Sequence, residues 1–228
     1  MKKLYTLFVF SLLGKVAMAQ FTAGNIVVSR AGGDASNGAG TANLSNTSVP
    51  VFLDEYTPTG TYVQTVVIPN TTAGNRLTIA GSASSEGQLS RSANGSVLLL
   101  CGYDQPVGVS AVVSAAGNRV VAVIDRNEVV DASTTFTYGT SSIRSAVSDD
   151  GNNIWFAGSN SGQYYIAKGA GNTSVLVAST VTNTRSLAIA NGQLYMSNAS
   201  GSNPRIGTVG SGLPTTTGNT FAGLPGLP

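Results

Sequence analysis

Acidic and amide side chains are densest around Gly151, where Asp149, Asp150, Asn152 and Asn153 lie almost side by side. A hard cation such as Ca²⁺ binds about six to eight oxygen atoms from groups of this kind. The spacing lacks the alternating ligands and distal glutamate of an EF-hand loop, and Asp and Asn also bond to the backbone of their own turns. We therefore expect a structural turn, with a calcium site at Asp149, Asp150 and Asn152 as the alternative and no other metal or cofactor.

Catalytic residues are hard to assemble from this composition. The chain has no histidine, which removes the usual general base and the most common metal ligand. Paired carboxylates could cleave a glycosidic bond, but the sequence places no two of them at a working separation. We assign no catalytic residue and leave open whether the protein is an enzyme, favouring a protein that is not. The available carboxylates are Asp54, Glu55, Glu86, Asp104, Asp125 and Glu128.

Arg91, Arg144 and Arg185 each precede a turn glycine and are candidate binding residues, together with Trp155. Arginines that line a channel would bind anions through their planar fork of donors. The reading that we favour is that each arginine caps its strand unit through hydrogen bonds to carbonyl or carboxylate oxygens, because repetition in register is typical of structural residues. Trp155 could stack on a sugar ring, but packing in the core is its expected role.

These residues lie on three similar segments of the chain. Their turn glycines, Gly95, Gly151 and Gly192, follow one another at intervals of 56 and 41 residues. A turn followed by a short apolar strand, recurring at about this period, is typical of β-propeller blades. The segments are 88–102 (QLSRSANGSVLLLCG), 142–158 (SIRSAVSDDGNNIWFAG) and 184–198 (TRSLAIANGQLYMSN).

The composition predicts an all-β fold. Only 10% of the residues are charged and 28 are glycine, a profile that suits short strands joined by tight turns. We expect a β-propeller-like domain over residues 20–228, with about four blade units in an incomplete ring and no further strand pair in the tail after residue 209. Loops over 31–48 and 104–109 are expected to present a binding face. The units are 21–75, 76–133, 134–179 and 180–228, and the expected strands are 24–30, 51–56, 62–68, 77–80, 97–101, 119–125, 128–132, 142–147, 154–157, 164–167, 174–178, 186–189, 194–197 and 205–209.

Residues 1–19 have the three parts of a secretory signal peptide. Lys2 and Lys3 precede an apolar stretch that is too short to span a membrane, and small residues follow it. We expect cleavage after Ala19 and a secreted or cell-surface protein. Loss of three lysines leaves nine basic residues against ten acidic ones, so we expect no nucleic-acid partner and no attraction to membranes. Cys101 is the only cysteine, which excludes an intrachain disulfide.

The turn motifs SANG, SDDG and IANG, each followed by an apolar strand, resemble those of bacterial secreted β-propeller repeats of the WD40-like and YVTN-like kind. GNIVVSRAGG, PVFLDEYTPTG and EGQLSRSANGSVLLLCGY are similar to the N-terminal part of large exported bacterial surface proteins. The resemblance covers most of residues 20–228, and we expect a truncated member because no surface-attachment module follows these motifs. SDDG with Trp155 also resembles the Asp-box of sialidase propellers, but Asp150 and Gly151 are adjacent here and no catalysis is implied.

Together these features predict an exported, non-catalytic scaffold that contacts a protein or a glycan outside the cell. The alternative is a fragment of an extracellular propeller hydrolase or lyase whose catalytic residues lie on missing blades. An open ring would leave strand edges unpaired, so self-association is a further expectation.

Overall fold

β-strands make up all the regular structure in the part of the chain that the computed structural model describes, residues 20–35 and 44–226. Runs of β-branched and apolar residues form the strands, and glycine and asparagine residues at positive φ close many of the turns. The predicted all-β class is confirmed. Within these residues, nothing helical has the length and apolar character needed to cross a membrane. The predicted signal peptide, residues 1–19, and part of the loop predicted over 31–48 lie outside the described residues.

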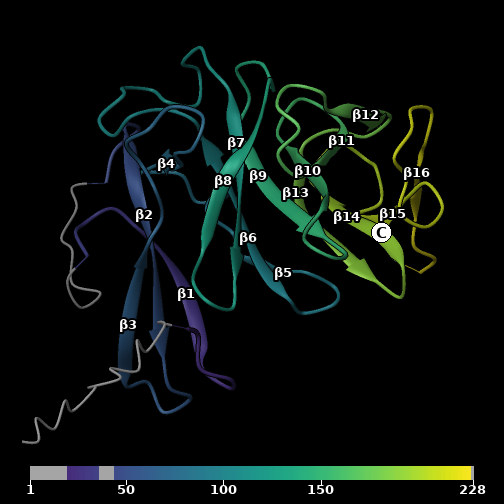
Figure 1. The fold of residues 1–228 in the computed structure, drawn as a ribbon. Helices are drawn as coiled ribbons and strands as arrows, with labels where there is room; N and C mark the ends of the chain where they lie inside the picture. The colour runs from purple at the N-terminus through teal and green to yellow at the C-terminus, as the bar shows by residue number, and fades with distance from the viewer. Residues whose placement is uncertain (1–19, 36–43, 227–228) are drawn as a thin grey trace, which may run out of the picture.

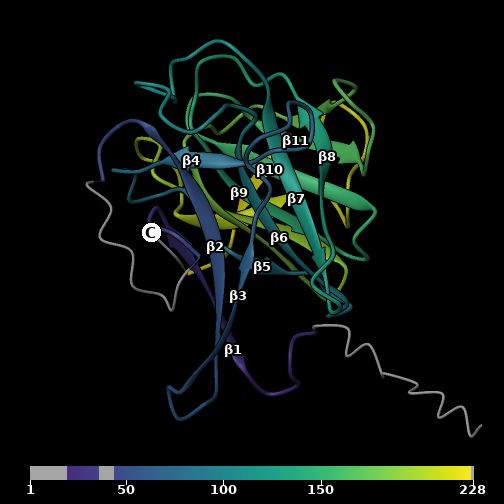
Figure 2. The same ribbon diagram turned by 60° about the vertical axis from the view of Figure 1, so that its left-hand side comes forward.

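The first eight strands form one antiparallel sheet (Figure 1). They are β1 (Ile26–Ala31), β2 (Ser48–Tyr56), β3 (Tyr62–Val67), β4 (Thr78–Ala80), β5 (Ser90–Arg91), β6 (Val97–Tyr103), β7 (Arg119–Asp125) and β8 (Val130–Phe136). The order is β1-β2-β4-β6-β7-β8, with β3 paired to β2 and β5 paired to β6. The hairpin of β2 and β3 projects beyond the other strands (Figures 1 and 2).

In the middle of this sheet, the pairing between β4 and β6 is reduced to one residue pair. Thr78 of β4 faces Tyr103 of β6, and this is the single pair in the register of the two strands. A Cβ atom at Gly102 would lie 2.4 Å from the carbonyl oxygen of Thr78, so the strands can approach here only because residue 102 is glycine. The narrowing divides the sheet into a β1–β4 half and a β5–β8 half. In the second half, each strand pairs with the next one along the chain.

Two further sheets have the same four-stranded meander. The first contains β9 (Ile143–Ser148), β10 (Asn153–Gly158), β11 (Gln163–Ala167) and β12 (Val175–Ala178), and the second contains β13 (Thr184–Ala190), β14 (Gln193–Asn198), β15 (Ile206–Val209) and β16 (Phe221–Gly223). The tail after residue 209, where we predicted no further strand pair, contributes one strand, β16, which pairs with β15. A Cβ at Gly207 would lie 2.3 Å from the carbonyl oxygen of Ala222, so glycine permits this pairing. A three-residue strand with one large apolar side chain carries no periodic pattern that a sequence could reveal.

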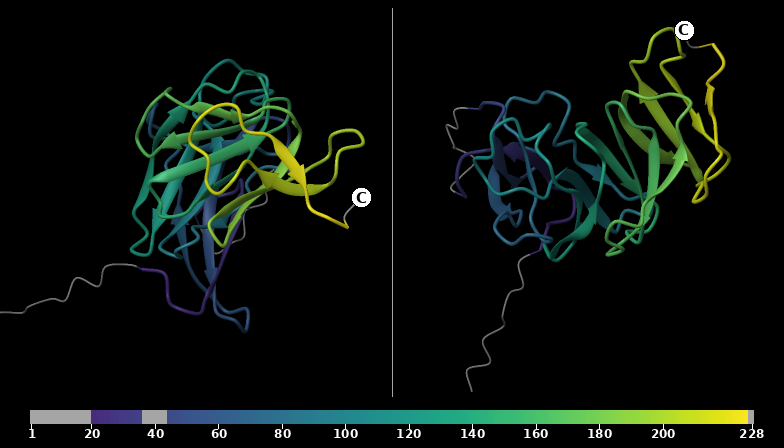
Figure 3. Two further views of the ribbon diagram at one scale, coloured as in Figure 1. Left: turned by 90° about the vertical axis from the view of Figure 1, so that its right-hand side faces the viewer. Right: turned by 90° about the horizontal axis from the view of Figure 1, so that it is seen from above.

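The strand groups stack face to face in chain order, as Figure 3 shows from above. An apolar cluster fills each space between neighbouring groups. Leu53 and Leu100 lie in the cluster between the two halves of the first sheet. Phe136 of β8 and Phe156 of β10 stack with ring centroids 3.7 Å apart in the second cluster. Trp155 of β10 lies in the third cluster, which also contains core residues of the β13–β16 sheet. Burial of these side chains is the main stabilising contribution to the fold.

The three similar sequence segments form corresponding hairpins. Gly95, Gly151 and Gly192 lie in the turns of the β5–β6, β9–β10 and β13–β14 hairpins, at φ values of +74°, +91° and +71°. Each hairpin is the first in its group of four strands. Neighbouring hairpins also contact one another directly, since the Ser90 hydroxyl on β5 donates a 2.6 Å hydrogen bond to the carbonyl of Ala146 on β9.

Candidate functional site

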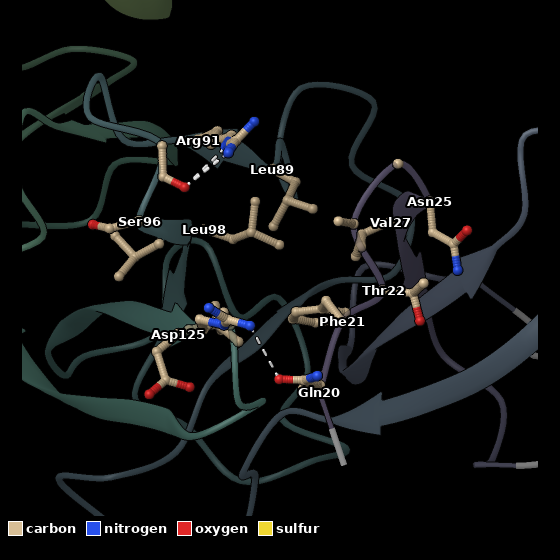
Figure 4. A pocket seen from close by; sticks show the side chains of 16 residues that line it. Gln20, Phe21, Thr22, Asn25, Val27, Leu89, Arg91, Ser96, Leu98 and Asp125 are labelled. Atoms are coloured by element: carbon tan, nitrogen blue, oxygen red, sulfur yellow. Dashed lines mark hydrogen bonds between the residues drawn. The ribbon is translucent and has the colours of Figure 1, made fainter. Parts of the chain in front are cut away.

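A groove of about 610 Å³ opens between β1 and the β5–β6 hairpin. One wall is the N-terminal segment 20–25 with Val27 of β1, and the other is Leu89, Arg91 and the stretch 95–98. Residues 124–126, at the end of β7, complete the lining. Figure 4 shows the apolar side chains of Phe21, Val27, Leu89 and Leu98 gathered around the opening.

The groove exists because the two halves of the first sheet diverge at this end. Phe21, Val27, Leu89 and Leu98 pack against the core cluster between the halves but are only partly buried. The Ser29 hydroxyl joins β1 to the carbonyl of Gly87 with a 2.7 Å hydrogen bond. On the other side, the Phe21 N–H donates to the carbonyl of Arg126 at 3.0 Å. These four apolar side chains therefore form the floor of the groove, and hydrogen bonds to the carbonyls of Gly87 and Arg126 hold its walls.

Two guanidinium groups stand on the rim. Arg91 is exposed and donates from Nε and Nη2 to the carbonyl of Gly95, at 3.1 and 2.9 Å. Arg126 donates from Nη2 to the Gln20 side chain at 3.2 Å. Neither has an ion-pair partner among the described residues. The nearby carboxylate of Asp125 accepts the N–H groups of its own turn, so the rim carries net positive charge.

A buried carboxylate holds the N-terminal wall in place. Glu55 is fully buried, and its Oε1 accepts 2.7 Å hydrogen bonds from the Thr22 N–H and the Asn25 side chain. Its Oε2 accepts from Nε2 of Gln64 at 2.6 Å, and the same nitrogen donates to Oε1 of Glu128 at 2.6 Å. Burial works to raise the pKa of Glu55, but the hydrogen bonds from Gln64, Thr22 and Asn25 outweigh it and the pKa falls below its usual value.

Glu55 and Glu128 share one donor, Nε2 of Gln64, and this arrangement bears on catalysis. Burial, together with the charge of Glu55, raises the pKa of Glu128 although Gln64 acts in the opposite direction. Opposite pKa shifts in neighbouring carboxylates are typical of acid–base pairs. Here the Gln64 amide stands between the two carboxylates and Glu55 is closed to solvent, so a substrate cannot contact both. The pair is structural in this conformation.

The structure places Arg91 apart from Arg144 and Arg185. Arg91 contacts its own turn at the groove, whereas Arg144 on β9 donates from Nη1 to the Asn183 side chain at 2.7 Å and to the carbonyl of Thr184 at 3.0 Å. Arg185 on β13 is exposed and makes no hydrogen bond or ion pair to another described residue. Carbonyl capping is thus the observed role of Arg91 and one of the roles of Arg144.

Trp155 lies away from any open surface. It is 1% exposed, and its indole N–H donates to the carbonyl of Pro214 at 2.7 Å. Its ring lies against that of Tyr165, with centroids 5.5 Å apart. No face of the indole is open to a sugar ring.

The acidic turn between β9 and β10 is held by its own backbone. Oδ1 of Asp150 accepts the N–H groups of Asn152 and Asn153, at 2.7 and 3.0 Å, and these bonds lower its pKa to about 2. Burial and the charge of Asp150 raise the pKa of Asp149. Among the described residues, no group of three or more His, Cys, Asp or Glu side chains is placed to hold a metal ion. The arrangement is that of an Asx turn.

Most of the groove was not foreseen from the sequence. Arg91 is the one groove residue among the predicted sites, because its position before a turn glycine marked it. Val27, Leu89 and Leu98 carry no such signal, since each is an ordinary strand or loop residue. The loop predicted over 104–109 is pinned to the start of β2, where the Ser48 hydroxyl donates to the carbonyl of Pro106 at 2.6 Å and the Ser48 N–H donates to the carbonyl of Val109.

No protein-family model matches this chain, and no curated protein matches it.

Proposed function

We propose that this protein is an exported, non-catalytic, β-propeller-like scaffold that binds an extended polypeptide segment of a partner protein. The binding site would be the groove between β1 and the β5–β6 hairpin. The observation that carries the proposal is an apolar floor with two unpaired guanidinium groups on its rim.

The propeller interpretation is supported by the repeated plan of the sheets. Three groups of four strands, β5–β8, β9–β12 and β13–β16, are antiparallel meanders whose first hairpins carry the three turn glycines. They stack through apolar clusters, as blades do. Export is supported by residues 1–19, where basic residues are followed by an apolar stretch and then by small residues. A blade scaffold presents loops and gaps at its edges, and the groove is such a gap.

An extended chain fits the edges that border the groove. β1 pairs with β2 on one side, and β5 pairs with β6 on one side, so the facing edges of both strands have no partner strand among the described residues. A peptide that added as a strand to the β1 edge would form main-chain hydrogen bonds and place alternate side chains on the floor. Val27 belongs to β1 and also lines the groove, so a peptide paired with the β1 edge would lie beside the apolar floor.

The charge of the rim defines the partner further. Arg91 and Arg126 have no ion-pair partner in the described chain, so an acidic residue beside the apolar ones would gain charge-assisted hydrogen bonds. A saccharide fits less well, because the described floor presents aliphatic side chains and a single aromatic ring, that of Phe21. The expected segment is therefore an extended peptide with apolar side chains and at least one carboxylate.

A peptide selection tests this proposal. A displayed library of random linear peptides would be selected on the purified protein, and enriched peptides would be titrated against variants. We expect Arg91→Glu and Arg126→Glu each to weaken binding at least about tenfold, since each replaces an attractive rim charge by a repulsive one. Arg205→Glu makes the same charge change at an exposed arginine outside the groove and should leave the affinity unchanged.

Two results would contradict the proposal. One is a selection that enriches no peptide, and the other is a set of peptides that bind the two rim variants as tightly as the original protein. A glycan array run in parallel tests whether the groove binds a saccharide. Glycan binding that depends on Arg91 and Arg126 would show that the partner is a glycan and not a polypeptide.

A further inference from the structure

A second positively charged position lies between β9 and β13, apart from the groove. These are the first strands of neighbouring sheets, and the Leu187 N–H on β13 donates to the Ser145 hydroxyl on β9 at 3.0 Å. Arg144 lies next to Ser145, and Arg185 lies two residues before Leu187. The contact between the strands therefore brings two arginines to one place.

Arg144 is buried without a full set of acceptors. It is 9% exposed, and both of its hydrogen bonds come from Nη1, to Asn183 and Thr184. Its Nε is buried and has no hydrogen-bond partner. A guanidinium group has five N–H donors, and a buried donor that lacks an acceptor destabilises the folded state. The arrangement leaves donors of a buried cation free to bind an acceptor from outside the described chain.

The other buried arginine shows how the fold satisfies such a group internally. Arg119 is fully buried, and its guanidinium donates to the carbonyls of Gly117, Val113 and Ser141 while it lies 4.7 Å from the centre of the Tyr103 ring. All three of its nitrogen atoms have acceptors. Of the two buried arginines in the described chain, only Arg144 has a buried nitrogen without an acceptor.

Arg185 brings a second positive charge near Arg144 but offers no side-chain acceptor for the free Nε of Arg144. It directly follows Thr184, whose carbonyl Arg144 binds, and it makes no hydrogen bond or ion pair to another described residue. Burial lowers the pKa of Arg144, and the charge of Arg185 lowers it further. The carboxylate of Glu86 and the hydroxyl groups of Tyr138 and Tyr103 act in the opposite direction but form no ion pair with Arg144.

The neighbouring carboxylate is already engaged. Glu86 accepts a 2.6 Å hydrogen bond from the Tyr103 hydroxyl and a 3.2 Å bond from the Ala80 N–H. It therefore has its own partners, and the two arginines have no carboxylate within ion-pair distance in the described chain. The charge of Arg185 acts on Arg144, and an anion bound by both guanidinium groups would relieve this repulsion.

We propose that Arg144 and Arg185 form a binding site for an oxyanion, a phosphate or a carboxylate group, at the junction of β9 and β13. Arg144 would supply its buried Nε donor from a fixed position, and Arg185 would fold over the anion from the exposed side. The site is independent of the groove and does not rest on the function proposed for it.

Thermal unfolding in different anions tests the site. The full chain would be heated in sodium phosphate, sodium acetate and sodium chloride at equal ionic strength, so that general screening is the same in each. We expect phosphate or acetate to raise the unfolding midpoint above that in chloride, because an anion that binds only the folded state stabilises it. Because phosphate also stabilises folded proteins without binding to a site, only a rise that is smaller in Arg185→Gln assigns the ligand to that anion class, and the absence of such a rise with both anions overturns the proposal.

Matched variants tie the effect to the two arginines. Arg185→Gln changes an exposed side chain that makes no hydrogen bond or ion pair to a described residue, so the variant should fold and bind the anion at least about tenfold more weakly. Arg205→Gln makes the same change elsewhere on the β13–β16 sheet and should retain the full rise in midpoint. Arg144→Lys keeps the charge but loses the fork of donors, and it should also reduce the rise. Full retention of the effect in Arg185→Gln would overturn the proposal.

Discussion

The indole nitrogen of Trp155 on β10 donates a 2.7 Å hydrogen bond to the carbonyl of Pro214, in the segment between β15 and β16. Trp155 is the largest fully buried side chain and lies between the β9–β12 and β13–β16 sheets. This bond therefore ties the core of one sheet to the chain that crosses the edge of the next. The tail is part of the folded unit because of such contacts.

Replacement of Trp155 by phenylalanine should destabilise the fold. The variant leaves the Pro214 carbonyl without its donor and a cavity where the larger ring lay, so we expect a loss of about 2–4 kcal/mol in the free energy of unfolding. Urea denaturation measures the change. Tyr195→Phe is the control, because the hydroxyl of Tyr195 makes no hydrogen bond to a described residue and its removal should cost less than about 0.5 kcal/mol. Equal losses in both variants would contradict this role of the indole N–H.

The two neighbouring aspartates of the acidic turn should respond in opposite directions to neutralisation. Backbone hydrogen bonds lower the pKa of Asp150 to about 2, so its ionised form stabilises the fold at neutral pH. That contribution is complete above the unfolded pKa of about 3.9 and is lost as the pH falls through about 2. Asp150→Asn should therefore be less stable than the original protein at pH 7, and the difference should shrink as the pH falls below 4.

Asp149 provides the matched comparison. Burial and the charge of Asp150 raise its pKa, so its ionised form disfavours folding at neutral pH. That unfavourable contribution disappears as the pH falls through the raised pKa, because the carboxyl is then neutral. Asp149→Asn should be as stable as the original protein at pH 7, or more stable, in urea denaturation. A loss of stability equal to that of Asp150→Asn would show that the turn does not distinguish the two carboxylates.

Gln64 should be required for Glu55 and Glu128 to lie together. Its Nε2 donates to both carboxylates, so Gln64→Leu removes the shared donor and leaves them facing each other. We expect the free energy of unfolding to fall by about 2–3 kcal/mol at pH 7. Glu55 would lose a charge-assisted hydrogen bond, and the Gln64 amide would no longer separate its charge from that of Glu128. Adding Glu128→Gln should restore part of that loss. A double variant no more stable than Gln64→Leu would argue against repulsion between the carboxylates.

The strands were the part of the fold most open to prediction. Runs such as Val97–Tyr103 and Arg119–Asp125 are rich in apolar and β-branched residues, and the glycines at 95, 151 and 192 mark the turns at positive φ. Every strand expected from the sequence overlaps an observed one. Two observed strands, β5 and β16, were not predicted: β5 is only two residues long, and the pairing of β16 depends on the backbone of β15 at Gly207 and not on a pattern of its own.

The sites were less open to prediction because they depend on how the sheets meet. Val27 and Leu98 are far apart in the sequence, and they line one groove only because the two halves of the first sheet diverge there. Arg144 and Arg185 were noted for their matching positions, yet their surroundings differ. Arg144 reaches across to Thr184 of the next sheet, whereas no further sheet among the described residues follows the one that carries Arg185.

Amide hydrogen exchange on the complex with a selected peptide is the most direct test of the proposed scaffold function. A peptide bound in the groove should slow exchange at the amides of β1 that do not bond to β2 and at residues 89–91, and it should leave the β13–β16 sheet unchanged. Slower exchange confined to another part of the molecule, or no slowing in the presence of saturating peptide, would contradict the assignment of the groove as the binding site.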